Sequence, residues 1–146
     1  MKTLTAENDF GRTKQTIALA DIMVDEEHSV VDVANNWAVF PRHLQVATSI
    51  ALQGLKNPII VLASADKYRF TASGGRIQFA VVNGYTHIDA IVLEDEADVR
   101  PLMVEQAQTE SQYLDPQYIN EWWKEPVIET QLQADVASLQ APQGTP

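Results

Sequence analysis

The feature that most constrains the fold is a change of hydrophobic period within residues 68–81. Apolar and polar residues alternate through residues 68–72, which is typical of a strand with one buried face. Ile77, Ala80 and Val81 then follow the three- and four-residue spacing of a helix. Between the two periods stands a short run: Ser73, Gly74, Gly75 and Arg76. The pattern predicts a strand that turns sharply into a helix.

A turn of this kind suggests chemistry at the start of the helix. The first backbone N–H groups of a helix have no partner within it, so they point outward from its N-terminus. The two glycines allow a ligand to approach the backbone closely, and the planar fork of Arg76 suits a phosphate or a carboxylate. We therefore expect an anion site at this helix N-terminus. The alternative is an ordinary Ser-Gly-Gly turn followed by a solvated arginine.

Length and composition indicate one globular domain. The chain has 146 residues, and 45% of them are hydrophobic, so it can bury a substantial core. It contains no cysteine, which excludes disulfides, thiolate zinc sites and cysteine nucleophiles. No apolar run approaches the roughly 18–20 residues that span a bilayer, and the first residues lack the apolar core of a secretory signal. We expect a cytoplasmic protein that does not enter a membrane.

The net charge of −10 is concentrated in the last third of the chain. Residues 1–90 hold eight Lys/Arg and nine Asp/Glu, whereas residues 91–146 hold two Lys/Arg and eleven Asp/Glu. A duplex-binding surface needs clustered positive charge to displace counterions from the phosphates. The acidic third would repel DNA, and the near-neutral first part has no basic run. We therefore expect no specific DNA binding.

The rest of the pattern predicts an α+β fold. Strands are expected at residues 17–24, 59–62 and 88–93, with a short strand or turn at 29–33. The strand at 59–62, wholly apolar and so buried on both faces, should pair as a hairpin with the strand at 68–72. Helices are expected at 41–52, at 76–83 and from about Pro101 through Ala107. Two more are expected, from Asp115-Pro116 to before Pro126 and around residues 132–139.

We divide the chain accordingly. Residues 1–16 are expected to be a flexible N-terminal arm, residues 17–112 the domain, residues 113–140 an acidic helical extension and residues 141–146 a tail. Gly54 and the pair Asn83-Gly84 have the composition of helix C-caps.

Other polar and aromatic groups carry weaker indications. Asn35 and Asn36 form either the second wall of a site or a simple Asx turn. Trp122 and Trp123 would lie over a core or against a partner subunit, and stacking on a nucleobase is disfavoured by their acidic surroundings. Residues 94–96 are consecutive acids that suit a helix N-terminus, and a divalent cation there is the lesser alternative. The histidines have neither metal-ligand nor triad spacing, so we assign no metal site and no catalytic residue.

The order of these elements resembles the N-terminal domain of the ParB family, within the ParB/sulfiredoxin superfamily. Members typically read as a helix, Gly-Leu-x-x-Pro-Ile-x-Val, Tyr-x-x-x-x-Gly-x-x-Arg, a helix ending in Gly, and Pro-Ala-Ile-Val. A Glu-Asn-x-Gln stretch follows in the family. The corresponding stretches here are Gly54–Val61, Tyr68–Ala80, Gly84-Tyr85, Ile88–Val92 and Val104–Gln108. The resemblance covers about residues 17–110 and implies a small mixed sheet with packed helices.

The resemblance also implies a nucleotide site. By position, Ser73, Gly74, Gly75 and Arg76 would cradle phosphate, with Arg76 as the main charge. Glu105 and Gln106 would correspond to the Glu-Asn pair near the metal and triphosphate, and Asn35 and Asn36 to the Asn-Pro-Arg loop, with Arg42 a few residues on. The implied cofactor is a nucleoside triphosphate with Mg²⁺.

Departures from the family limit which activities carry over. Ile77 stands where the partition proteins have a second arginine, and sulfiredoxin's cysteine has no counterpart. The 35 or so acidic residues that remain do not correspond to the partition proteins' helix-turn-helix domain. The leading hypothesis is a nucleotide- or phosphate-binding domain. The alternatives are an inactive accessory or structural protein of a phage or mobile element, acting through a protein partner or as a homo-oligomer, and, last, a ParB-like metal-dependent nuclease.

Overall fold

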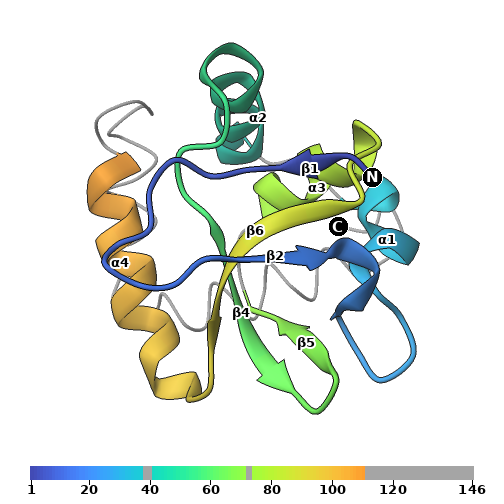
Figure 1. Cartoon of the computed structure of the whole chain (residues 1–146). Coiled ribbons are helices and arrows are strands. Elements are labelled where there is room, and N and C mark those ends of the chain that lie inside the picture. Colours follow the sequence, from blue (N-terminus) through green and yellow to red (C-terminus); the bar gives the residue numbers. More distant parts are fainter. Residues whose placement is uncertain (38–40, 72–73, 111–146) are drawn as a thin grey trace.

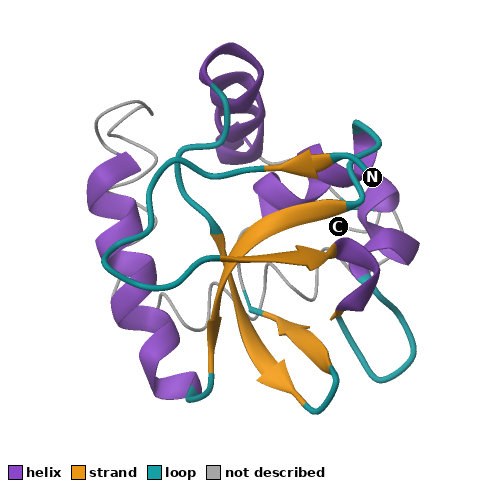
Figure 2. Cartoon of the chain, viewed as in Figure 1, coloured by secondary structure: helices purple, strands orange, loops and turns teal. Residues whose placement is uncertain are grey.

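The chain folds into a curled mixed sheet with helices packed around it (Figures 1 and 2). The computed structural model describes residues 1–37, 41–71 and 74–110, and of residues 41–45 and 110 it describes the backbone alone. The strands are β1 (Thr3–Leu4), β2 (Gln15–Ala18), β3 (Ile22–Met23), β4 (Ile59–Ser64), β5 (Lys67–Phe70) and β6 (His87–Leu93). The α-helices within these residues are α1 (Val30–Val33), α2 (Pro41–Gln53), α3 (Gly74–Val82) and α4 (Val99–Glu110). Short 3-10 turns are η1 (Leu19–Asp21), η2 (Ala34–Asn36) and η3 (Glu96–Asp98). The expected α+β class is confirmed.

Strand β6 pairs with β1, β2 and β4 in the sheet. The strand order is β1-β6-β4-β5-β3, and β2 also pairs with β6. β4 runs parallel to β6, with Ile59 opposite Ala90, whereas β4 and β5 are antiparallel, with Val61 opposite Phe70. The expected hairpin is therefore confirmed. Because β4 and β5 are antiparallel, the first residues of β4 lie beside the last residues of β5, at the end of the sheet where the chain leaves for α3.

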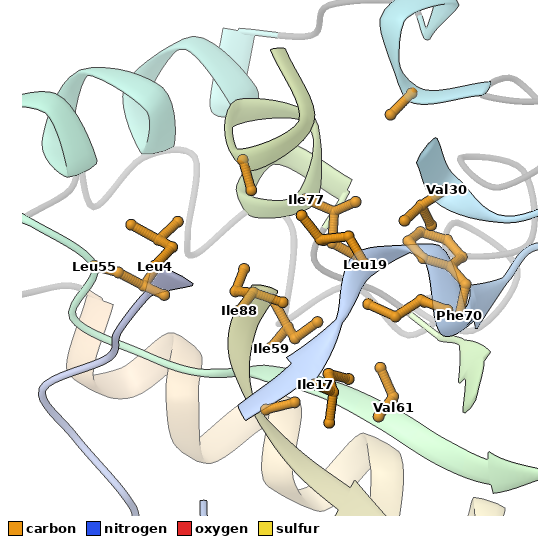
Figure 3. Close-up of a cluster of buried hydrophobic side chains, with 14 of the residues drawn as sticks. Leu4, Ile17, Leu19, Val30, Leu55, Ile59, Val61, Phe70, Ile77 and Ile88 are labelled. Carbon is orange, nitrogen blue, oxygen red and sulfur yellow. The ribbon is translucent and has the colours of Figure 1, made fainter. Parts of the chain in front are cut away.

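Strand β4 is buried on both faces, as its unbroken apolar sequence predicts. Ile59 and Val61 belong to a large core with residues of α3, α1 and the N-terminal strands (Figure 3). The alternate residues Ile60 and Leu62 belong to a second core, which contains Leu102 and other residues of α4. Successive side chains of a strand point to opposite faces. Helix α4 therefore covers one face of the sheet, and the other helices lie on the opposite side.

The three helices expected within the described residues are confirmed, with some changes at their ends. α2 covers the expected residues, and Gly54 follows it with a φ of +80°. α3 begins at Gly74 instead of Arg76, and Gly84, at a φ of +78°, follows it. The N–H of Tyr85 donates to the carbonyl of Ala80, and that of Gly84 to Val81, which is a Schellman end. α4 begins two residues before Pro101, because Pro at a first-turn position needs no N–H partner.

Residues 30–33 form a helix, where the sequence pattern favoured a short strand or a turn. Ser29 and Asp32 form a capping box, in which the backbone N–H of Ser29 donates to the Asp32 carboxylate at 2.9 Å. Val30 is fully buried and packs in the main core. The pattern was misleading because only one turn is formed, and one turn is too short for a helical period to be visible.

The strand expected at residues 17–24 is divided by a 3-10 turn. Its first half belongs to β2, which pairs with β6, and its second half is β3, which pairs with β5. Leu19, the first residue of the 3-10 turn, and Ile22, the first residue of β3, are both fully buried. Both halves of this segment contribute buried apolar residues, and the turn between them contains the exposed Ala20 and the half-buried Asp21, which pairs with Lys67 at the surface. The apolar composition on both sides of the turn did not reveal the break.

The first 16 residues, expected to be an arm outside the domain, contribute strands to the sheet. β1 pairs in parallel with residues 87–88 of β6. The buried Asp89 of β6 accepts hydrogen bonds from the N–H of Ala6 and from the hydroxyl of Thr16, each at 2.9 Å. Leu4 and Ala6 of this mostly polar segment are also buried in the main core, so backbone pairing, one carboxylate and two buried apolar side chains together hold it.

Several expectations lie outside the described residues. These are the acidic helical extension at 113–140, the tail at 141–146, the tryptophans Trp122 and Trp123, Ser73 and the side chain of Arg42. No described helix has the length and apolarity required to cross a membrane.

The loop before α1 is organised by Asp25. Its carboxylate accepts the backbone N–H groups of Glu27 and His28, and the ring Nδ1 of His28 lies 3.0 Å from Asp25 Oδ2. These backbone bonds, followed by the His28 side chain, lower the pKa of the Asp25 carboxyl. In turn the hydrogen bond and charge of Asp25 raise the pKa of His28 above 6.5.

Packing predicts a large difference between two leucine truncations. Leu102→Ala in α4 should lower the free energy of unfolding by about 2–5 kcal/mol, because Leu102 is 1% exposed between α4 and the sheet. The matched control Leu52→Ala, at a residue 78% exposed in α2, should change it by no more than about 0.5 kcal/mol. Urea denaturation followed by circular dichroism measures both. Equal small effects would mean that α4 is not packed on the sheet.

The Asp25–His28 pair predicts a defined pH response. Because the folded pKa of His28 lies above its unfolded value, the pair stabilises the fold at pH below about 6.5. This contribution disappears as pH rises through the folded pKa. NMR titration of the His28 ring should show the raised pKa, and Asp25→Asn should return it toward 6.5 while still accepting the backbone N–H groups. An unchanged titration in Asp25→Asn would contradict the pairing.

Candidate functional site

The strand and the helix that the sequence predicts on either side of the Ser-Gly-Gly-Arg run are present, at the end of the sheet where β4 begins. β5 ends at Phe70 and α3 begins at Gly74. Between them, the hydroxyl of Thr71 donates to the carbonyl of Ile60 in β4 at 2.7 Å, which ties the connection to the sheet. Gly75 is buried and Gly74 is half-buried at the first turn of the helix.

Arg76 is turned into the protein. Its side chain is 9% exposed, and Nη1 donates to the carbonyl of Pro58 at 2.7 Å and to that of Asn57 at 3.2 Å. Nη1 also lies 3.2 Å from Oε1 of Gln106 in α4. The sequence analysis treated Arg76 as the main phosphate-binding charge. In the structure this guanidinium joins the first turn of α3 to the start of β4 and to α4.

Gln106 of α4 completes this junction from the opposite face of the sheet. It is 2% exposed, and its Nε2 donates to the carbonyl of Pro58 at 2.9 Å while its Oε1 accepts from Arg76. The structure thus brings together two of the expected site residues, Arg76 and Gln106. Glu105, the residue before Gln106, is exposed and takes no part in this buried junction.

Asn57 belongs to the same network, although the sequence pattern assigns it no role in a site. It is 1% exposed, and its Nδ2 donates to Thr109 Oγ1 at 3.1 Å and to the carbonyl of Gln106 at 3.4 Å. Its Oδ1 accepts from Nδ2 of Asn8 in the N-terminal segment at 2.9 Å. An amide directly before a wholly apolar strand was the available signal, because a polar side chain at that position must be buried with partners.

The expected second wall packs against α3. Asn35 and Asn36 are exposed in η2. Gln78 of α3 donates through Nε2 to the carbonyl of Ala34 at 3.3 Å and to that of Trp37 at 3.1 Å. These two bonds hold the backbone of η2 beside the first half of α3. Gln78 was not identified from the sequence, since a glutamine in a helix carries no distinctive pattern.

Trp37 is the residue that links this wall to β5. Its side chain is 2% exposed, and its ring lies tilted against Phe70, with centroids 5.5 Å apart and planes at 52°. Within the described structure the buried indole Nε1 has no hydrogen-bond acceptor. A buried donor left without a partner costs about 1–3 kcal/mol, and the N–H of a buried tryptophan usually finds one.

The charges around the site are unevenly exposed. The guanidinium of Arg76 is buried at the N-terminal end of α3, where the helix dipole is also positive. Arg69, one residue before the end of β5, lies at the surface with its Nη2 3.3 Å from Glu96 Oε1.

The groups whose pKa is shifted (Glu7, Asp25, His28 and Lys67) are all solvent-exposed and pair with neighbours away from α3. Among the described residues, no three histidine, aspartate or glutamate side chains gather where they could hold a metal ion.

No protein-family model matches this sequence, and no curated protein matches it.

The buried junction predicts that Arg76 matters for stability. Arg76→Ala should lower the free energy of unfolding by about 2–4 kcal/mol, because it removes a charged donor from the buried carbonyl of Asn57 and from Gln106 Oε1. The matched control Arg69→Ala removes an exposed ion pair and should change it by less than about 1 kcal/mol. Chemical denaturation of both variants provides the comparison. Similar values for the two variants would show that the Arg76 hydrogen bonds do not stabilise the fold.

Proposed function

We propose that this chain binds a phosphate-bearing ligand, a nucleotide in the leading case, at the N-terminus of α3. One observation carries the proposal. The first turn of α3 combines two glycines with the buried guanidinium of Arg76 at the same, positive end of a nine-residue helix. Unpaired backbone N–H groups, close approach and positive potential are the three properties that helix-terminus phosphate sites share.

The inward orientation of Arg76 changes the role that we assign to it. Its Nη1 bonds to Asn57, Pro58 and Gln106 fix the start of α3 relative to the sheet. In this proposal the backbone N–H groups of the first turn contact the phosphate, and Arg76 acts as a positioning residue that also contributes a positive field. A rigid first turn loses little conformational entropy when the ligand binds, which favours affinity.

The surrounding residues supply polar groups that suit a nucleotide. Asn35 and Asn36 are exposed on the wall that Gln78 holds beside α3. Glu105 is the exposed carboxylate on α4 next to Gln106. Mg²⁺ in nucleotide sites is usually held by phosphate oxygens with one or two carboxylates, so Mg²⁺ would enter with the nucleotide and Glu105 is the carboxylate that fits. The resemblance to the ParB/sulfiredoxin superfamily supports the same ligand class, and we propose that arrangement for the fold.

A second candidate is supported by the same arginine. Because Arg76 forms bonds within the protein, the fold itself requires it, whether or not a ligand binds. This would suit an accessory or structural protein of a phage or mobile element that keeps the fold and acts through a protein partner or a second copy. The first candidate predicts that the protein binds a nucleotide in a calorimetric titration, and the second predicts that it does not.

The discriminating experiment uses Gly74, because Arg76→Ala is expected to weaken the fold. Gly74→Asp places a carboxylate at the first residue of α3, where a negative charge stabilises the helix. The same carboxylate repels a phosphate held by the helix N–H groups, so affinity should fall at least about tenfold. Calorimetric titration with CTP, ATP and GTP in the presence of Mg²⁺ measures this, and Gly74→Ala is the matched control with an added side chain but no charge.

The outcomes separate the candidates. Binding by the wild type and by Gly74→Ala, together with weak binding by Gly74→Asp, supports the site. Equal affinity of Gly74→Asp and Gly74→Ala would place the ligand elsewhere. A folded wild type that binds none of the three nucleotides would overturn the proposal and favour the accessory protein, whose self-association light scattering would detect.

A further inference from the structure

The indole N–H of Trp37 is the buried polar side-chain group that the described structure leaves without a partner. Trp37 is 2% exposed, so water does not reach the donor freely. Most buried polar groups in native proteins are hydrogen-bonded, and an exception calls for a physical explanation. An indole N–H can only donate, so the missing partner must be an acceptor.

The position of Trp37 relates this donor to the proposed ligand site. Its ring lies against Phe70, the last residue of β5, and α3 begins only four residues later at Gly74. Its backbone carbonyl accepts from Gln78, which lies one turn into α3. The Trp37 ring is therefore packed on the last residue of β5, and the Trp37 backbone is tied to the first half of α3.

We propose that Trp37 is a ligand-binding residue, whose Nε1–H donates a hydrogen bond to an oxygen of the nucleotide held at the N-terminus of α3. This inference rests on the proposed function. A phosphate or sugar oxygen is the acceptor that the indole lacks, and the bond would be strongest to a charged oxygen. It would add a side-chain donor to the backbone N–H groups of the first turn.

The burial of Trp37 gives the interaction a further property. Since its Nε1 is buried, an acceptor can reach it only if neighbouring side chains shift. Ligand binding would therefore be coupled to a local rearrangement beside the β5–α3 connection. Phe70 packs against the ring and Gln78 holds the Trp37 backbone, so the rearrangement would leave the ring itself near its present position.

Nuclear magnetic resonance of the indole N–H groups tests the proposal directly. The chain has three tryptophans, and comparison of wild type with Trp37→Phe assigns the Trp37 resonance. Addition of CTP, ATP or GTP with Mg²⁺, whichever binds the wild type, should move the Trp37 indole proton downfield as its hydrogen bond forms. This measurement uses the unaltered protein, so it holds even if Trp37→Phe proves unstable.

Affinity provides the second test. Trp37→Phe keeps an aromatic ring against Phe70 but removes the donor, and it should weaken binding of the same nucleotide about tenfold, the change expected for one hydrogen bond to a charged acceptor. The matched control Tyr85→Phe removes a polar atom from an aromatic residue beyond the C-terminal end of α3, and should leave affinity unchanged.

Each result decides the question. A shifted Trp37 resonance and a selective loss in Trp37→Phe support the proposal. If the wild type and Gly74→Ala bind nucleotide, but the Trp37 resonance stays in place or Trp37→Phe binds as tightly, the Trp37 assignment is wrong and the α3 site stands. If the wild type binds no nucleotide, the proposed function fails and the Trp37 assignment fails with it.

Discussion

The structure depends on the hydrogen bonds that the guanidinium of Arg76 makes at the start of β4. Arg76 and Gln106 both donate to the carbonyl of Pro58, and Asn57 donates to α4 from the neighbouring position. Because the chain enters β4 through Pro58, its preceding carbonyl groups lie inside the fold and need donors. Arg76 in the first turn of α3 and Gln106 in the second half of α4 supply these donors, and Asn8 of the N-terminal segment donates to the side-chain Oδ1 of Asn57.

This polar junction is needed because β4 is covered on both faces. Ile59 and Ile60 point to different cores and are both fully buried, so no water reaches the start of the strand. Apolar contacts hold α4 over one face through residues such as Leu102, and α3 over the other through Ile77. Apolar burial is non-directional, whereas the Arg76 and Gln106 hydrogen bonds fix how the two helices meet at the edge.

The sequence predicts the elements that have a long, regular pattern and misses those that depend on tertiary contacts. The strand at 59–62, its hairpin with β5, and helix α2 with its Gly54 cap follow from period and turn chemistry alone. β1 and the division of residues 17–24 could not be read from the sequence, because pairing with β6 and β5 decides both. At the site, the pattern placed glycines and an arginine at a helix start, but the direction of the Arg76 side chain depends on Pro58 and Gln106, which are 18 and 30 residues away.

The inward direction of the Arg76 side chain limits what an arginine in a sequence motif says about function. A guanidinium that satisfies buried carbonyl groups is required by the fold, so its presence in a strand–turn–helix pattern supports the architecture more strongly than it supports a reaction. The indole N–H of Trp37 has the opposite character, because it is buried with no acceptor among the described residues, and a donor in that state lowers stability. A group that the fold does not satisfy points to a ligand more directly than one that it does. For this reason the indole N–H, unpartnered among the described residues, supports the proposed α3 ligand site alongside the glycines and the guanidinium of its first turn.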